Sequence, residues 1–172
     1  MQVSQLGEFG LIARLRDAVA QRLPAVPSDA SSPNPPNLLV GIGDDCAVWQ
    51  SGPLTQFATT DTMVRGVHFD PAYTSWHDAG WKALAVNLSD IAAMGGVPDY
   101  ALITLGLPPT TEVQDIDDLY QGMTACAGEF GGLLAGGDIV SSSQFFVTVA
   151  LLGHAVLPVP FPNNALLRSA AR

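Results

Sequence analysis

Four separate segments of the chain each carry a carboxylate within otherwise apolar or small-residue sequence. These carboxylates belong to Asp45, Asp61, Asp90 and Asp138. Removing a carboxylate from water without a partner costs roughly several kcal/mol, so each needs a cation or a set of hydrogen-bond donors. Basic partners are scarce, because Lys82 is the only lysine. A bound metal ion is therefore the better counter-charge, and we expect the four segments to converge on one site. The alternative for any single aspartate is a turn or a cap in the core.

The neighbours of two of these aspartates add oxygen ligands. Alternation along a strand predicts that Thr59 and Asp61 share a face, whereas Thr60 joins them only through its backbone or a local bend. By the same rule Asp44 and Asp45 point to opposite sides, so one can face the site while the other closes the turn. Carboxylates, hydroxyls and water form an oxygen-only ligand set, which Mg²⁺ and Ca²⁺ prefer.

Magnesium held by carboxylates usually completes its shell with substrate phosphates, and phosphoryl transfer is the chemistry that this favours. The chain has no GxxxxGK[ST], no GxGxxG after a strand and no protein-kinase signature, so the phosphate charge must be met mainly by metal.

Three single residues carry weaker signals. His68 could donate to a phosphate or satisfy a turn carbonyl. Arg168 could bind a phosphate bidentately or lie in solvent near the end of the chain. Tyr120 is by default half-buried packing on a helix.

The elements that must position these residues follow from hydrophobic period and from turn residues. The pattern predicts an α+β fold, a mixed β-sheet packed with helices, in the order α-β-β-β-α-β-α-β-β. The glycine pair 95–96 ends the second helix, Ser75 caps its start, and Thr110 or Thr111 caps the third helix. We expect helices at 7–22, 75–95 and 111–130, and strands at 38–42, 47–49, 56–64, 100–107, 133–135 and 145–156.

Length and composition limit the class of protein. The 172 residues suit one domain, 48% of them are hydrophobic, and only 13% are charged, which excludes a disordered polymer. The net charge of −9 repels nucleic acid and anionic membranes. No stretch has the length of a membrane span and no signal peptide is present, so we expect a cytoplasmic protein. We interpret 1–172 as one domain that binds Mg²⁺ and a nucleotide, with a proline-rich loop at 24–37. Because the tail at 157–172 follows directly on a strand, we expect an N-terminal piece of a longer protein.

Taken in order, these motifs resemble the N-terminal half of thiamine-monophosphate kinase, within the aminoimidazole ribonucleotide synthetase-like superfamily. The likeness runs from about Gly7 to Arg168, and the ordered set is far more specific than any one motif. The segments that carry it are Gly7–Ile12, Gly41–Ala47, Thr59–Phe69, Lys82–Gly95, Gly136–Asp138 and Leu167–Ser169.

The resemblance implies transfer of the ATP γ-phosphate to thiamine monophosphate, giving thiamine diphosphate. Asp44 is a possible orienting acid, His68 corresponds to the substrate-binding position, and Tyr120, Gly137, Asp138 and Arg168 correspond to ATP contacts. No protein nucleophile is implied. The implied ligands of several Mg²⁺ ions are Asp45, Thr59, Thr60, Asp61, Asp90 and Asp138.

The resemblance also implies a homodimer whose two sheets join into a barrel. Ile139 and Ala170 replace the family's usual Thr and Gly, and the family's second domain is absent from these 172 residues. The fragment alone is therefore expected to bind Mg-nucleotide without turnover. The alternatives are a non-catalytic Mg-nucleotide-binding or dimerisation fragment, or a related superfamily enzyme with another substrate.

Overall fold

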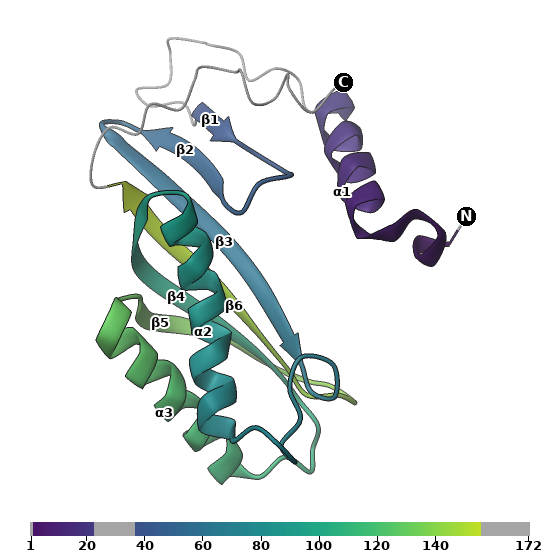
Figure 1. The fold of residues 1–172 in the computed structure, drawn as a ribbon, viewed down its shortest axis with the longest axis vertical. Helices are drawn as coiled ribbons and strands as arrows, with labels where there is room; N and C mark the ends of the chain where they lie inside the picture. The colour runs from purple at the N-terminus through teal and green to yellow at the C-terminus, as the bar shows by residue number, and fades with distance from the viewer. Residues whose placement is uncertain (1, 23–36, 156–172) are drawn as a thin grey trace.

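The computed structural model describes residues 2–22 and 37–155, which form three helices and six strands (Figure 1). The expected order of elements is confirmed. The proline-rich loop, except for its last residue, and the tail at 157–172 lie outside the described residues. The elements are α1 (Val3–Arg22), β1 (Asn37–Val40), β2 (Ala47–Ser51), β3 (Leu54–Val64), α2 (Trp76–Ala93), β4 (Gly96–Leu107), α3 (Val113–Phe130), β5 (Leu133–Ser141) and β6 (Phe146–Ala155).

Most boundaries lie within two residues of the expected ones, but α1 begins at Val3 rather than at 7, and β4 and β5 are also longer than expected. β4 begins directly after α2, at Gly96, and β5 continues through the Gly-Gly-Asp segment to Ser141. The N-cap of α3 is Glu112, whose side chain makes no capping bond, so the expected caps Thr110 and Thr111 are wrong. Ser75 does cap α2, because its hydroxyl accepts a hydrogen bond of 3.0 Å from the Asp78 backbone N–H.

The strands form one mixed sheet in the order β1-β2-β3-β6-β4-β5. All neighbours are antiparallel except β4 and β5, which run parallel and are joined through α3. Such a crossover is the usual way to return a chain to a parallel neighbour. The last strand, β6, lies between β3 and β4 and pairs with both along nearly its whole length.

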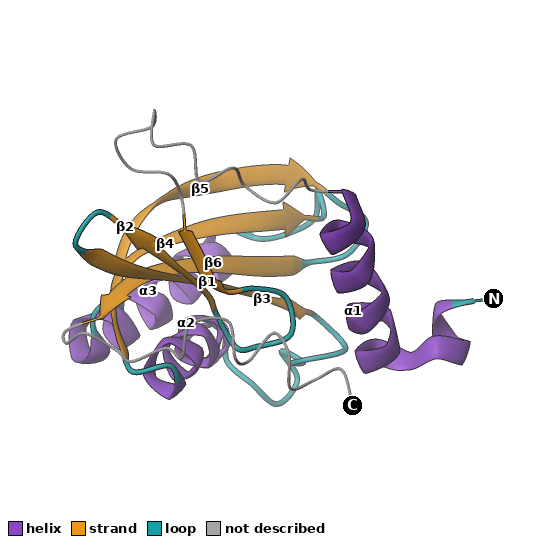
Figure 2. Ribbon diagram, turned by 90° about the horizontal axis from the view of Figure 1, so that it is seen from above, coloured by secondary structure: helices purple, strands orange, loops and turns teal. Residues whose placement is uncertain are grey.

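Helices α2 and α3 cover one face of this sheet (Figure 2). Their apolar side chains and the odd-numbered residues of β3, β4 and β6 form the core, with Phe57, Ile103 and Val149 almost completely buried. The two helices approach closely because a glycine lies on each. A Cβ at Gly80 would overlap the Leu119 carbonyl oxygen, and one at Gly122 would overlap that of His77.

No described helix covers the other face, which we call the bare face (Figure 2). It carries the even-numbered residues of β3, β4 and β6, since alternate residues point to opposite sides. Thr62 and Thr148 are hydrogen-bonded across it at 2.8 Å. Large apolar side chains are also exposed there, including Tyr100, Leu102 and Leu152. A sheet with one side uncovered in this way normally requires another layer.

Helix α1 lies beside the sheet, away from α2 and α3 (Figures 1 and 2). It is interrupted at Gly7, whose φ of 71° is not helical. Its periodic apolar residues are largely exposed, with Phe9 at 85% and Leu15 at 51%. The periodicity therefore predicted the helix correctly, but the helix does not bury its apolar side in the core. No helix among the described residues is long and apolar enough to cross a membrane.

Candidate functional site

The centre of the candidate site is a direct contact between β3 and α2. The Thr59 hydroxyl donates a 2.7 Å hydrogen bond to the Asp90 carboxylate. Thr59 is buried, and Asp90 is partly buried on the side of α2 that packs against β3. The alternation of β3 places Asp61 on the same side as Thr59, as the sequence predicted.

Two further carboxylates act on Asp90. Burial raises the pKa of Asp90 above its ordinary value, the bond from Thr59 lowers it, and the negative charges of Asp61 and Asp45 raise it further. Burial, with the charges of Asp90, Asp45 and Asp44, raises the pKa of the adjacent Cys46 thiol to about 12. The structure therefore brings Asp45, Asp61 and Asp90 within electrostatic reach of one another, and Cys46 stays a neutral thiol beside them.

The turn between β1 and β2 supplies the two adjacent aspartates. Asp44 closes this turn, because its carboxylate accepts a 3.0 Å hydrogen bond from the Asp45 backbone N–H. Gly43 has a φ of 117°, which favours glycine. Asp45 is exposed. It opens on a cavity of about 920 Å³ between the turn, β3 and α1, whose lining includes Phe9, Ile12, Asp44, Asp45, Thr59 and Thr60.

The polar groups of this cluster fit a hard divalent cation. None of Asp44, Asp45, Asp61 and Asp90 forms an ion pair with a basic side chain within the described residues. One turn before Asp90, the side chain of Asn87 is fully buried; its amide donates to the Ala83 carbonyl, and its Oδ1 has no partner. A buried amide oxygen without a partner, carboxylates without a basic partner in the described residues, and a threonine hydroxyl are all oxygen donors of the kind that Mg²⁺ accepts.

The described residues hold no ready-made cage for a metal ion, however. In residues 2–22 and 37–155, no three His, Cys, Asp or Glu side chains are close enough together to hold an ion by themselves. Magnesium is commonly bound by only one or two carboxylates, with water or phosphate completing its shell.

Asp138 lies apart from Asp45, Asp61 and Asp90 within one chain, whereas Thr60 lines the same cavity as Asp45. Asp138 on β5 is in register with Thr104 of β4, and both β4 and β6 separate it from β3. Three strand spacings amount to roughly 14 Å. Asp138 and Thr60 also project from the bare face, opposite to Thr59 and Asp61. The expected convergence of all four carboxylates is therefore not seen for Asp138 in the single chain.

The residues expected to contact a nucleotide are also spread out. Gly137 lies so close to β4 that a Cβ would overlap the Ile103 carbonyl oxygen. Tyr120 is half-buried on α3 and lines a shallow hollow of that helix, away from β3. Arg168 lies outside the described residues.

The turn after β3 carries His68. His68 Nδ1 accepts a 3.0 Å hydrogen bond from the Val64 backbone N–H, and its carbonyl accepts one of 3.0 Å from the Lys82 ammonium. The imidazole is exposed. The sequence left two roles open for the imidazole, a donor to a phosphate or a donor to a turn carbonyl. The second is not seen, because Nδ1 accepts from a backbone N–H of the turn instead. Nε2 has no hydrogen-bond partner among the described residues and is available to a ligand.

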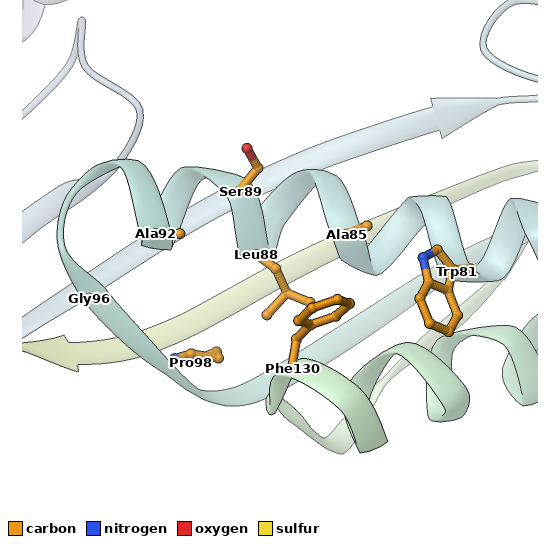
Figure 3. Close-up of a pocket in the computed structure, with 8 residues that line it drawn as sticks. All are labelled: Trp81, Ala85, Leu88, Ser89, Ala92, Gly96, Pro98 and Phe130. Atoms are coloured by element: carbon orange, nitrogen blue, oxygen red, sulfur yellow. The ribbon is translucent and has the colours of Figure 1, made fainter.

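A second cavity, of about 490 Å³, lies between α2, the end of α3 and the start of β4 (Figure 3). Trp81, Leu88 and Phe130 point into it, whereas the Ser89 hydroxyl points away from them (Figure 3). No predicted site residue lines this cavity. It offers few polar groups to orient a ligand.

Residues 43–155 match the family described as AIR synthase related protein, N-terminal domain. The chain belongs to the AIR synthase related family. Its match contains β2 to β6, α2 and α3, and so includes every acidic residue of the cluster.

Within the AIR synthase related family, the chain is homologous to the N-terminal half of thiamine-monophosphate kinases. It is 42% identical over 135 residues to that enzyme of Bacillus subtilis, covering 77% of this chain and 40% of the relative. It is 34% identical over 170 residues to that of Mycobacterium tuberculosis H37Rv, covering 99% of this chain and 46% of the relative. The chain thus spans less than half the length of either relative.

Solved structures show the same fold. One described as AaThiL complexed with AMPPCP and TMP superposes with a TM-score of 0.74 at 33% identity, covering 90% of this chain and 44% of that one. Thiamine monophosphate kinase from Aquifex aeolicus gives a TM-score of 0.68 at 30% identity, covering 91% and 45%. The sequence-based resemblance to this family is thereby confirmed.

Two side chains near the predicted residues were assigned no role by the sequence. Asn87 was visible only as a polar residue in an apolar helix, and Lys82 only as the sole lysine. The signal for Asn87 was its spacing of three residues before Asp90, which puts both on one helix face. No sequence signal linked Lys82 to His68, because that contact depends on how α2 packs beside the turn.

Proposed function

We propose that this chain is the Mg²⁺- and nucleotide-binding part of a thiamine-monophosphate kinase, which transfers the ATP γ-phosphate to thiamine monophosphate. One observation carries the proposal. The Asp90 carboxylate is partly buried, accepts a hydrogen bond from Thr59 and lies close enough to Asp61 and Asp45 to feel their negative charges. Within the described residues no basic side chain forms an ion pair with it. Homology to thiamine-monophosphate kinases supports the choice of substrates.

The proposed roles follow from position. Asp45, Thr59, Asp61 and Asp90 hold several Mg²⁺ ions, and Asp44 fixes the turn that carries Asp45. When bound, Mg²⁺ offsets the negative charge of the carboxylates and of the phosphates. The acceptor phosphate attacks directly, so the chain aligns its substrates and supplies no nucleophile.

Substrate contacts come from other elements. His68 donates to thiamine monophosphate from the ring nitrogen that the turn leaves available. Gly137 allows the nucleotide to approach the backbone, and Asp138 beside it acts as a further metal ligand. Tyr120 and Arg168 are proposed ATP contacts.

A homodimer formed through the bare face fits the positions of Thr60 and Asp138. Both residues project from that face, and so do the exposed apolar side chains of Tyr100, Leu102 and Leu152. Pairing two such faces buries the apolar patch and closes the two sheets into a barrel. Thr60 and Asp138 then lie at the junction between the copies, which is where we place the nucleotide.

The proposal is tested by calorimetric titration of the chain with AMPPCP, with Mg²⁺ and with EDTA. We expect binding only with Mg²⁺, and its loss in Asp61→Asn. Asp78→Asn is the matched control, because Asp78 is an exposed residue near the start of α2. Mg-independent binding, or equal binding by Asp61→Asn, would contradict the proposal.

A second candidate function is a Mg-nucleotide-binding or dimerisation unit without catalysis. It is favoured by the coverage of only 40% and 46% of the two relatives' lengths. An assay of thiamine diphosphate formation separates the two functions. We expect Mg-nucleotide binding but no turnover from the 172 residues alone, and turnover when the C-terminal half of a relative is fused to them.

A further inference from the structure

We propose that Lys82 is a positioning residue for His68, holding the turn after β3 so that the imidazole presents a fixed Nε2–H donor to an anionic substrate. The inference rests on the proposed function for the identity of that substrate, the phosphate of thiamine monophosphate. The positioning itself rests on contacts within this chain.

The turn is closed by its own backbone. The N–H groups of Val67 and His68 both donate to the Val64 carbonyl, at 3.1 and 2.9 Å, and Gly66 N–H donates to the Phe69 carbonyl at 2.8 Å. Gly66 has a φ of 80°, which a residue with a side chain adopts at a cost. The chain therefore reverses tightly over 64–69.

Both ends of the turn are held from outside. Gln144, on the β5–β6 connection, donates from its side chain to the Arg65 carbonyl at 3.0 Å. On the other side Lys82 of α2 donates from Nζ to the His68 carbonyl at 3.0 Å. Phe69 anchors the turn in the core, with its ring edge-to-face against Trp76 and Phe145 at centroid distances of 5.5 and 5.8 Å.

These contacts fix which ring nitrogen of His68 carries the proton. β2 pairs with β3 only as far as Ala58, so the Val64 N–H has no strand partner on that side and donates instead to His68 Nδ1. A nitrogen that accepts a hydrogen bond carries no proton, and the neutral imidazole is therefore protonated at Nε2. The ring is exposed, so this donor is available to a ligand.

The charge around the turn suits an anionic ligand. Lys82 and Arg65 both lie at this turn, with the Arg65 guanidinium 5.9 Å from the centre of the Trp76 ring. Basic residues are few in this chain, whose net charge is −9. Two cations and a neutral N–H donor together favour a phosphate over a neutral group.

The test uses the 172-residue chain with Lys82→Met, which keeps most of the stem and removes the charged donor. Lys82→Arg keeps the charge and is the conservative rescue. Arg14→Met is the matched control, because Arg14 is an exposed cation on α1. For each variant, imidazole ¹⁵N shifts report the His68 tautomer, and calorimetry reports affinity for thiamine monophosphate in the presence of Mg²⁺ and AMPPCP.

We expect the wild-type chain and Arg14→Met to show the single Nε2–H tautomer. Lys82→Met should show exchange between the two tautomers and about tenfold weaker binding, the size expected when a charge-assisted hydrogen bond is lost. Lys82→Arg should restore most of both. An unchanged His68 tautomer in Lys82→Met overturns the inference, and weaker binding with an unchanged tautomer shows direct contact in its place. A third outcome is that the wild-type chain does not bind thiamine monophosphate but Lys82→Met still shows tautomer exchange at His68. That outcome upholds the positioning role of Lys82 and overturns only the proposed substrate.

Discussion

At Asp90, burial and the neighbouring negative charges both raise the pKa of the carboxyl group. The carboxylate is partly removed from water, and the charges of Asp61 and Asp45 add to the cost of ionising it, while only Thr59 opposes them. Such an arrangement lowers the stability of the empty protein and raises its affinity for a cation. It is an expected property of a binding site, where stability gives way to function.

This predicts a pH dependence in the metal-free protein. The pKa of Asp90 is raised from its ordinary value of 3.8, so the folded chain binds that proton more tightly than the unfolded chain. The free energy of unfolding should therefore fall as the pH rises from 3.8 through the raised folded pKa. Asp90→Asn should lessen this fall and should be at least as stable as wild type at pH 7. Urea unfolding in EDTA across this pH range measures both effects, and equal slopes would contradict them.

Asn87 offers a second test at the level of single residues. Its buried Oδ1 has no partner, whereas its amide donates to Ala83. Asn87→Leu removes the unpaired acceptor together with one hydrogen bond, so the free energy of unfolding should stay constant or rise by up to about 1 kcal/mol.

Affinity for Mg²⁺ should fall about tenfold in the same variant if Oδ1 accepts from a metal-bound water. Calorimetric titration with MgCl₂ and AMPPCP measures this, with Asp78→Asn as the control. A loss of stability above about 2 kcal/mol with unchanged affinity would show that Oδ1 is satisfied within the protein.

The sequence predicted part of the site at this scale. It predicted the shared face of Thr59 and Asp61, and that one of Asp44 and Asp45 closes the turn, because strand alternation and short carboxylates are local properties. The position of Asp138 could not be predicted in the same way. Its distance from Asp61 depends on two strands, β4 and β6, that lie between β3 and β5.

At the scale of elements, the contact between α2 and α3 requires that two positions carry no Cβ atom. Gly80 and Gly122 let the two backbones meet, since a Cβ at either would overlap a carbonyl oxygen of the other helix. Gly122→Ala should therefore lower the free energy of unfolding by about 2–3 kcal/mol, the cost of overpacking a core that cannot relax.

Gly128→Ala is the matched control for that variant. It lies on the same helix and a Cβ there meets nothing within 4 Å, so the better helix propensity of alanine should stabilise the protein by about 0.5–1 kcal/mol. Chemical denaturation of both variants checks the pair. Similar effects from the two substitutions would mean that α2 and α3 can move apart.

Element order was predictable because each helix and strand has its own hydrophobic period. Ends were predictable only where one residue type decides them, as Ser75 does for α2. For α3 the threonines before Glu112 offered a better cap by residue type than the one used. For β5 the glycines looked like a stop, but pairing with β4 extends the strand through them.

For the whole molecule, the bare face leads to a prediction about assembly. We expect the chain to form a dimer that Leu102→Glu dissociates, because the substitution places a charge on a face that we propose is buried between copies. Val113→Glu is the control, since Val113 is 76% exposed at the start of α3. Sedimentation velocity at micromolar concentration distinguishes the states. A monomeric wild type, or a dimeric Leu102→Glu, would contradict the proposed dimer.

The order of strands in the sheet could not be predicted from the sequence, because it depends on all the strands together. Nothing in the periodicity of Phe146–Ala155 says that it lies between β3 and β4 rather than at an edge. That position is decided by which arrangement buries most apolar surface, and this is a property of all the strands together.

The central place of β6 also governs how the protein can form during synthesis. Residues 54–64 and 96–107 leave the ribosome well before residues 146–155 that must join them. Until then both strands present unpaired hydrogen-bonding edges to the cell, the kind of surface on which nascent chains associate wrongly. A premature stop codon before residue 146 would remove β6, and the released polypeptide would therefore be prone to aggregate rather than fold as a slightly shortened domain.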